Sequence, residues 1–364
     1  MKNKKTIIIV TIFVVIAVLH VIVAKLIFSG SRDVNNIENT DSAGGEKPPV
    51  DISPDKTTPD EPVPVIPKKV AKVPAKAAQK LSPAGLPLNY LNAVRGDIPD
   101  LPGSKEAKSG ILVDLNTRQV LWCKNSDKGF PIASMTKMMT ILLAMEDITA
   151  GKASLSTPVK VTVAAYKIGG TTVYLDPRET FTLGELMQSM MIRSANDSAY
   201  LVAEYFSDYN MPAFVARMNK RAVELKMKDT HYINPNGLPG NDRKSQCESS
   251  PEGLVLLAEQ LLKYPEVMKW CSTRTATFRP KGDKAMQLMT NTNKLIGTCP
   301  GVDGMKTGFT NAAGSCITVT CLRGGKRMVA VVTGMKQWRT RNKFVKELLD
   351  WGYKRDAKLG SIKP

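Results

Sequence analysis

Two kinds of apolar pattern alternate along the central and C-terminal parts of this chain. Residues 134–145 and 183–192 carry apolar side chains at helical spacing, so both segments predict buried helices. Residues 315–322 and 328–333 are strand-like, and the Arg323-Gly-Gly-Lys326 segment between them predicts a hairpin turn. The mixture of helices and strands indicates an α/β protein. A last helix predicted over 340–351 would pack four apolar side chains on the sheet: Phe344, Val345, Leu348 and Leu349.

The N-terminal apolar segment is longer than the apolar runs in the rest of the chain and is preceded by lysines. Residues 7–28 are apolar apart from Thr11, His20 and Lys25, which is close to the roughly 20 residues needed to span a bilayer. Three lysines precede it, so the positive-inside rule places the N-terminus in the cytoplasm. We expect a single-pass anchor in the cytoplasmic membrane. A cleaved signal peptide is the alternative, and in both cases the rest of the chain is exported.

A proline-rich stretch separates this segment from the patterned region. Twelve of the 23 prolines lie between Ser29 and Pro102, where aromatic residues are scarce, and this composition is typical of a disordered, partly extended tether. The sequence therefore predicts three parts. They are an anchor or signal segment (1–28), a tether (29–103) and one exported domain (104–364).

Charge and cysteine content narrow the class of function. The formal net charge is +18. The export signal argues against a nucleic-acid partner. The charge is better explained by attraction to anionic lipid or wall polymer, or by solubility alone. The six cysteines lie in the exported part without metal-ligand spacing, so no metal or other cofactor is expected. A domain of this size does not need disulfides, and we expect buried free thiols.

Ser134-Met-Thr-Lys137 is the first candidate for chemistry. Residues three apart on a helix share a face, so the Lys137 amine can reach the Ser134 hydroxyl. A serine hydroxyl needs a base before it attacks a carbonyl, and lysine is a base only when neutral. The apolar surroundings of Lys137 favour the neutral form. The alternative is an ordinary N-cap serine and a surface lysine.

Two further short patterns follow in the chain. Ser194-Ala-Asn196 lies at the break between two predicted helices, where Ser194 can relay a proton and Asn196 can hold a substrate amide; a helix-capping cluster is the alternative. Lys306-Thr307-Gly308 lies at a predicted strand start, where lysine and threonine can bind a carboxylate and Gly308 leaves room for a peptide. A strand-opening loop with a solvated lysine is the alternative there.

The three patterns, in this order, resemble those of the serine penicillin-binding proteins. Residues 104–354 resemble the D-alanyl-D-alanine carboxypeptidases of low molecular mass in particular. The similarity extends to five segments: 109–117, 131–140, 194–197, 234–238 and 302–310. It implies the β-lactamase/transpeptidase-like fold, an antiparallel sheet flanked by helices.

The resemblance also implies roles for individual residues. Ser134 would be the acylated nucleophile and Lys137 its base, with Ser194 in the proton shuttle and Asn196 on the substrate amide. Lys306 and Thr307 would engage the substrate's terminal carboxylate, next to Gly308. The backbone N–H groups of Ser134 and Phe309 would form the oxyanion hole. The chain departs from the family at Asn236 and Phe309, where His is frequent, and over 246–251, which puts local loop packing and side-chain contacts in doubt.

The implied function is a serine-type D-Ala-D-Ala carboxypeptidase. It would remove the terminal D-Ala from peptidoglycan pentapeptides through an acyl-enzyme and bind β-lactams as inhibitors, in the service of cell-wall synthesis and cell shape. A class A β-lactamase is disfavoured, because no Glu-x-x-x-Asn pattern lies between Asn196 and Lys306. A non-catalytic muropeptide or β-lactam receptor is disfavoured by the intact Ser134, Lys137 and Lys306. With only His20 and His231 present, a Ser-His-Asp triad is nearly excluded.

Overall fold

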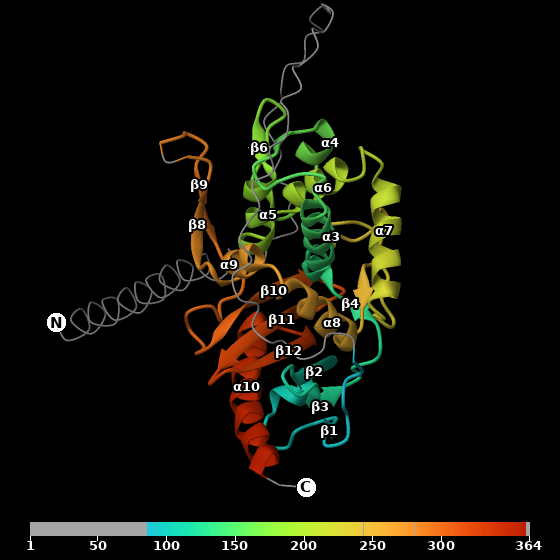
Figure 1. The fold of residues 1–364 in the computed structure, drawn as a ribbon, viewed down its shortest axis with the longest axis vertical. Helices are drawn as coiled ribbons and strands as arrows, with labels where there is room; N and C mark the ends of the chain where they lie inside the picture. The colour runs from blue at the N-terminus through green and yellow to red at the C-terminus, as the bar shows by residue number, and fades with distance from the viewer. Residues whose placement is uncertain (1–85, 243, 281, 362–364) are drawn as a thin grey trace, which may run out of the picture. The chain divides into compact units, whose positions relative to one another are not determined.

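A computed structural model describes residues 86–361 of the chain, except residues 243 and 281 (Figure 1). The predicted anchor, residues 1–28, and most of the predicted tether lie outside the described residues. Within the described part of the chain, no helix is both long and apolar enough to cross a membrane.

A six-stranded sheet in the order β1-β3-β2-β12-β11-β10 forms the centre of the fold. Its neighbouring strands are antiparallel except for the parallel pair β1 and β3, which confirms the predicted sheet. The predicted hairpin is β11 and β12, which turns through Gly324 and Gly325, both at positive φ. The strands are β1 (Val94–Arg95), β2 (Ser109–Asp114), β3 (Gln119–Lys124), β10 (Val302–Thr310), β11 (Gly314–Arg323) and β12 (Lys326–Met335).

Helices cover both faces of this sheet (Figure 1). On one face α10 (Trp338–Ser361) packs Phe344, Val345, Leu348 and Leu349 against the strands, as its apolar pattern predicted. The other face is covered by a larger group of helices, which begins with the short 3₁₀ helix η1. That group comprises η1 (Ala133–Thr136), α3 (Lys137–Thr149), α5 (Leu183–Ile192), α6 (Asn196–Tyr205), α7 (Met211–Glu224), α8 (Pro251–Leu261) and α9 (Pro265–Ser272).

Alternation along the strands divides the core into two apolar clusters. Ile111 and Val113 of β2 face the helical group, whereas Leu112 between them faces α10. The same rule separates Cys316 from Cys321 on β11, which lie in different clusters. All six cysteines are buried and free, as expected.

Short elements complete the described part of the chain. Two helical turns, α2 (Gly103–Glu106) and α4 (Val163–Tyr166), connect longer elements. Three two-stranded ribbons are formed by β4 (Phe130–Pro131) with β7 (Glu248–Ser249), β5 (Pro158–Lys160) with β6 (Thr180–Thr182), and β8 (Thr275–Phe278) with β9 (Gln287–Thr290).

The last part of the region predicted as a tether belongs to the folded domain. β1 pairs with β3, and Ile98 is only 4% exposed. The indole N–H of Trp122 donates to the Gly96 carbonyl at 2.7 Å. The boundary predicted at 103/104 is therefore wrong. It was based on the high proline content, but the segment that contains β1, Gly96 and Ile98 packs on the sheet and completes its edge.

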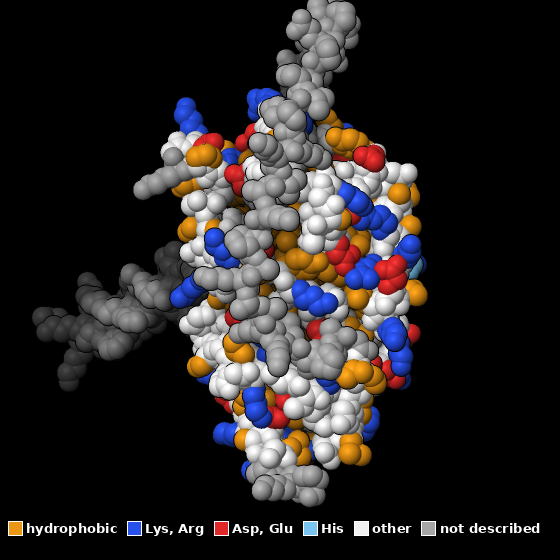
Figure 2. Space-filling model, in the orientation of Figure 1, with side chains coloured by type: hydrophobic (Ala, Val, Ile, Leu, Met, Phe, Trp, Pro, Cys, Tyr) orange, Lys and Arg blue, Asp and Glu red, His pale blue; other side chains and the backbone are white. Residues whose placement is uncertain are grey.

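Basic side chains do not gather in one stripe on the face shown in Figure 2. Lysine and arginine are interleaved there with aspartate and glutamate.

Candidate active site

The predicted nucleophile lies at the junction of η1 and α3. Ser134 is the second residue of η1 and Lys137 is the first residue of α3, so the expected continuous helix from Ser134 is interrupted by a 3₁₀ turn. Ala133, just before the serine, has a φ of 48°. Left-handed backbone at a non-glycine residue persists only where the surroundings hold it. Ser134 caps neither helix, because the N-cap positions are Ile132 and Thr136.

Lys137 is fully buried and has three polar partners. Its Nζ lies 2.9 Å from Ser134 Oγ, 2.6 Å from Asn196 Oδ1 and 2.7 Å from the Asn236 carbonyl oxygen. The alternative of a solvated surface lysine is therefore wrong. The partners come from η1, from the start of α6 and from the loop after His231, so three separate segments meet at this amine.

The surroundings of Lys137 favour its neutral form. Burial lowers the pKa of Lys137 well below its ordinary value, and the nearby charge of Lys306 lowers it further. Asp197 and Cys247 act in the opposite direction but do not offset burial. A lysine in its neutral form can take a proton from a serine hydroxyl.

Ser194 and Lys306 form a second buried pair. Ser194 lies between α5 and α6 with a φ of 71°, and its Oγ accepts a hydrogen bond of 2.8 Å from Lys306 Nζ. Lys306 also donates to the Thr307 carbonyl at 3.0 Å. Burial lowers the pKa of Lys306 to about 7, and Arg341 contributes in the same direction. The predicted loop with a solvated lysine is therefore wrong, since Lys306 is 1% exposed and lies within β10.

β10 is the edge strand of the sheet and runs against the nucleophile turn. A Cβ placed on Gly308 would overlap the Ile132 carbonyl and lie 3.2 Å from both Ala133 Cβ and the Met135 nitrogen. Only glycine allows this approach. The next residue, Phe309, is half exposed.

Asn196 is held from several directions. Its Oδ1 accepts from Lys137, and its Nδ2 donates to the Gly169 carbonyl at 3.0 Å. Its own main-chain N–H donates to the Thr171 carbonyl at 2.8 Å. The N-cap of α6 is Ala195, without a side-chain cap, so the helix-capping interpretation of this cluster is wrong.

Sequence patterns did not reveal every group around the site. The Asn236 carbonyl binds Lys137 through the main chain, so a position noted only as a departure from the family turns out to contact the predicted base. Gly237 follows it at a φ of 82°, and a Cβ there would overlap the Ala133 carbonyl. Arg341, known from the sequence only as part of a helix, is buried near Lys306.

Among the described residues, no group of three or more His, Cys, Asp or Glu side chains could hold a metal ion. The arrangement consists instead of a hydroxyl, two amines with lowered pKa values, an amide and a strand edge. These groups can carry out acyl transfer through a serine ester.

Comparison with known proteins points the same way. A family model described as "D-alanyl-D-alanine carboxypeptidase" matches residues 97–337. The chain is 38% identical over 267 residues to the D-alanyl-D-alanine carboxypeptidase DacF of Bacillus subtilis, which covers 71% of this chain and 67% of the relative. It is 29% identical over 274 residues to DacB2 of Mycobacterium tuberculosis, covering 73% of this chain and 88% of the relative.

A solved structure supports the fold assignment. The ampicillin-bound form of penicillin-binding protein D2 from Listeria monocytogenes aligns with a TM-score of 0.60 and 27% identity, covering 68% of this chain and 97% of that chain. The family match begins before the predicted domain boundary at 104, in agreement with the packed segment that contains β1.

Proposed function

The chain belongs to the D-alanyl-D-alanine carboxypeptidase family of serine peptidases, and from that premise we propose that Ser134 is the nucleophile with which it removes the terminal D-Ala of peptidoglycan stem peptides. The observation that supports this most strongly is the 2.9 Å contact between Ser134 Oγ and the buried Lys137 Nζ. The contact joins a nucleophile to a base where the edge strand β10 also approaches the serine turn.

Acylation follows from these contacts. Neutral Lys137 takes the proton of Ser134 while Oγ attacks the carbonyl carbon of the penultimate D-Ala. The negative charge that develops on the carbonyl oxygen is stabilised by the backbone N–H groups of Ser134 and Phe309. The close approach of Gly308 to the nucleophile turn supports this pair of donors.

Collapse of the intermediate breaks the peptide bond and requires a proton on the leaving nitrogen. Ser194, which is hydrogen-bonded to Lys306, gives its proton to that nitrogen and regains one from Lys137, which returns to the neutral form. Water then attacks the Ser134 ester and Lys137 accepts a proton from that water. As the ester bond breaks, Lys137 returns this proton to Ser134 Oγ and the shortened peptide leaves. Lys306 and Thr307 are assigned to the terminal carboxylate, and β-lactams enter by the same acylation step.

Covalent labelling with a fluorescent penicillin tests the assignment. Ser134→Ala is expected to abolish labelling without changing the melting temperature, because the substitution removes one oxygen. Lys137→Arg is expected to lower the labelling rate at least about tenfold, because arginine stays protonated and cannot accept the proton. Labelling of Ser134→Ala at the wild-type rate would contradict the proposal.

The lifetime of the label separates this function from its two rivals. A labelled band that decays slowly supports a penicillin-sensitive peptidase. Rapid release of opened penicillin supports a class A β-lactamase, and specific penicillin binding without covalent labelling supports a receptor. Release of D-Ala from a pentapeptide substrate by the wild type, and not by Ser134→Ala, completes the assignment.

We also propose that residues 1–28 hold the catalytic domain on the exported side of the cytoplasmic membrane. The support is the apolar run 7–28 with lysines before it. The full-length protein should then stay with membranes under alkaline carbonate extraction, and the protein without residues 1–28 should be released. A mature protein that lacks these residues by mass spectrometry would instead identify a cleaved signal peptide.

A further inference from the structure

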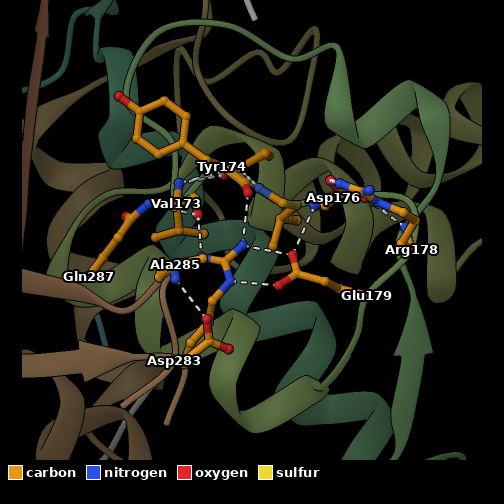
Figure 3. A network of polar contacts seen from close by, with 11 residues as sticks. Val173, Tyr174, Asp176, Arg178, Glu179, Asp283, Ala285 and Gln287 are labelled. Carbon is orange, nitrogen blue, oxygen red and sulfur yellow. Dashed lines mark hydrogen bonds and ion pairs between the residues drawn. The ribbon is translucent and has the colours of Figure 1, made fainter. Parts of the chain in front are cut away.

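A buried arginine joins the hairpin β8–β9 to the loop formed by residues 169–175 (Figure 3). Arg279 Nε and Nη2 each donate to the Glu179 carboxylate at 2.7 Å. Nη1 donates to the Val173 carbonyl at 3.0 Å, and Nη2 donates to the Tyr174 carbonyl at 2.8 Å. One side chain thus fixes two consecutive main-chain carbonyls of the 169–175 loop.

The side chain of Arg279 is buried and packs against two aromatic rings. Its side chain is 3% exposed, and its guanidinium carbon lies 5.3 Å and 5.1 Å from the ring centres of Phe181 and Phe278. Its own φ is 70°, in the left-handed region that non-glycine residues rarely adopt. A buried charge in strained backbone is costly to the fold, and it is retained here with both a carboxylate and carbonyl partners.

The opposite side of the 169–175 loop binds the Ser194-Ala-Asn196 segment. The Thr171 and Gly169 carbonyls accept from Asn196, as described above. The N–H groups of Val173 and Leu175 donate to the Asp197 carboxylate at 3.2 Å. Val173 therefore bonds Asp197 through its N–H and Arg279 through its carbonyl, which makes a continuous path between them.

We propose that Arg279, with Glu179, is a positioning residue for catalysis. By fixing the main chain at residues 173–174 it fixes Asn196, whose side chain in turn orients the Lys137 amine. The inference rests on the proposed function, because it assigns Arg279 a role only if Lys137 is the base. Arg279 acts through other groups, because its hydrogen bonds go to Glu179 and to main-chain carbonyls and not to Ser134 or Lys137.

The consequence for the chemistry follows from the hydrogen bonds of Lys137. Asn196 Oδ1 is its shortest partner, at 2.6 Å. When the 169–175 loop shifts, this acceptor shifts with it, and a misplacement of about 1 Å in a catalytic group costs up to roughly 100-fold in rate. A looser loop also lets water reach Lys137, which weakens the burial that keeps its amine neutral.

Two variants and one matched control test the role. Arg279→Lys keeps the charge but loses the planar fork, and Glu179→Gln keeps the shape but loses the charge of the partner. Arg178→Gln is the control. Arg178 forms a similar two-bond pair with Asp176 nearby, at 2.9 and 2.7 Å, but its side chain is 84% exposed. The full chain of each variant is labelled with fluorescent penicillin over a range of pH, and its melting temperature is measured.

We expect Arg279→Lys and Glu179→Gln to lower the acylation rate by about 10- to 100-fold. The pH midpoint of acylation should rise in both, because hydration raises the pKa of Lys137 toward its ordinary value. The ionisable groups around Lys137 are Lys306 on β10, Asp197 on α6 and Cys247 just before β7, and neither variant changes them. Arg178→Gln should stay within about twofold of the wild type, because exposed ion pairs contribute little.

The pH midpoint separates a positioning role from a purely structural one. Variants that melt at a lower temperature but keep the wild-type rate and midpoint would overturn the inference. If Arg279→Lys does not fold, Glu179→Gln decides the question by the same two measurements. A wild type that takes up no label at all would overturn the proposed function itself, which is a different result from unchanged labelling in the variants.

Discussion

The three partners of Lys137 fit a neutral amine. Asn236 O and Asn196 Oδ1 only accept hydrogen bonds, whereas Ser134 Oγ can also donate. A neutral amine has two N–H donors and one lone pair, so it can donate to both carbonyl oxygens and accept from the serine hydroxyl. Ser134 Oγ lies within hydrogen-bonding distance of Lys137 Nζ, so the lone pair of a neutral Lys137 can face the proton it must remove.

The pH dependence of acylation should report this amine. Acylation by penicillin is expected to rise with pH through the lowered pKa of Lys137, because only the neutral form is a base. Lys306→Met removes an amine whose protonated form lowers this pKa, so its midpoint should lie at higher pH than that of the wild type. Labelling rates measured from about pH 5 to pH 10 check the direction. A midpoint that stays in place or falls would show that Lys306 does not act on Lys137.

A second test at this scale concerns the terminal carboxylate. Lys306→Ala should impair turnover of a D-Ala-D-Ala peptide more than acylation by a neutral thioester without a carboxylate. A charge-assisted hydrogen bond is worth roughly 1.5–3 kcal/mol, or about 10- to 150-fold. Because the variant also affects Lys137, the ratio between the two substrates is the diagnostic quantity. Equal losses on both would mean that Lys306 tunes the base without binding the carboxylate.

Side-chain chemistry made part of the site predictable. The sequence named Ser134, Lys137, Asn196, Ser194 and Lys306, and the structure places the first three in one hydrogen-bonded group and the last two in another. It could not name the Asn236 carbonyl, because each residue has a carbonyl and only the fold selects one. Arg279 was missed for a related reason, since its partners are mostly main-chain atoms far away in the sequence.

At the scale of elements, the 3₁₀ turn at Ser134 is the feature that hydropathy could not reveal. In a 3₁₀ helix residues three apart lie directly above one another, which brings Lys137 over Ser134. Apolar spacing indicates burial but does not distinguish this tighter turn from the start of an α-helix. Gly237 and Gly308 lie so close to the turn at Ala133 that neither position has room for a Cβ. This close packing depends on tertiary structure and is not visible in the local sequence.

Gly308→Ala tests the fit between β10 and the nucleophile turn. The new Cβ would overlap the Ile132 carbonyl, so the strand or the turn must move. We expect the acylation rate to fall at least about tenfold, since small displacements of a nucleophile are costly. Gly360→Ala is the control, because a Cβ there meets nothing within 4 Å. Labelling rates and melting temperatures of both variants should be compared; wild-type labelling by Gly308→Ala would show that the turn tolerates the shift.

The regular elements were the most predictable part of the fold. Strand alternation identified β11 and β12 with their glycine turn, and helical spacing identified α5 and the sheet-facing side of α10. The 169–175 loop and the β8–β9 hairpin had no such pattern. The 169–175 loop is held by hydrogen bonds to Arg279 and Asp197. Hydrophobic periodicity does not report such polar contacts, so it could not predict the conformation of the loop.

At the scale of the whole molecule, one edge of the sheet contributes residues to the candidate active site and the other contributes to stability. β10 is one edge and contributes Lys306, Thr307 and Gly308 to the site. β1 is the other edge and is supplied by residues that composition alone assigned to the tether. The segment from residue 88 to 102 therefore contributes to stability at a distance from the chemistry.

Two truncations separate these tasks. A chain of residues 86–364 keeps β1 and should melt and acylate like the full protein. A chain of residues 104–364 loses the β1–β3 pairing, the buried Ile98 and the carbonyl of Gly96 that pairs with Trp122. Leaving the buried indole N–H of Trp122 without an acceptor costs about 1–3 kcal/mol, and burial of Ile98 contributes about 1.5–3 kcal/mol more.

For a domain of this size, each 1 kcal/mol changes the melting temperature by about 2–4 °C, so the shorter chain should melt at least roughly 5 °C lower. Its acylation rate at a temperature where it is folded should match that of the longer chain, because the lost strand is at the edge opposite β10. Thermal melts and penicillin labelling of the two chains measure both quantities. Equal melting temperatures would restore the tether boundary at residue 103, and a lower labelling rate in the folded short chain would connect the β1 edge to the active site.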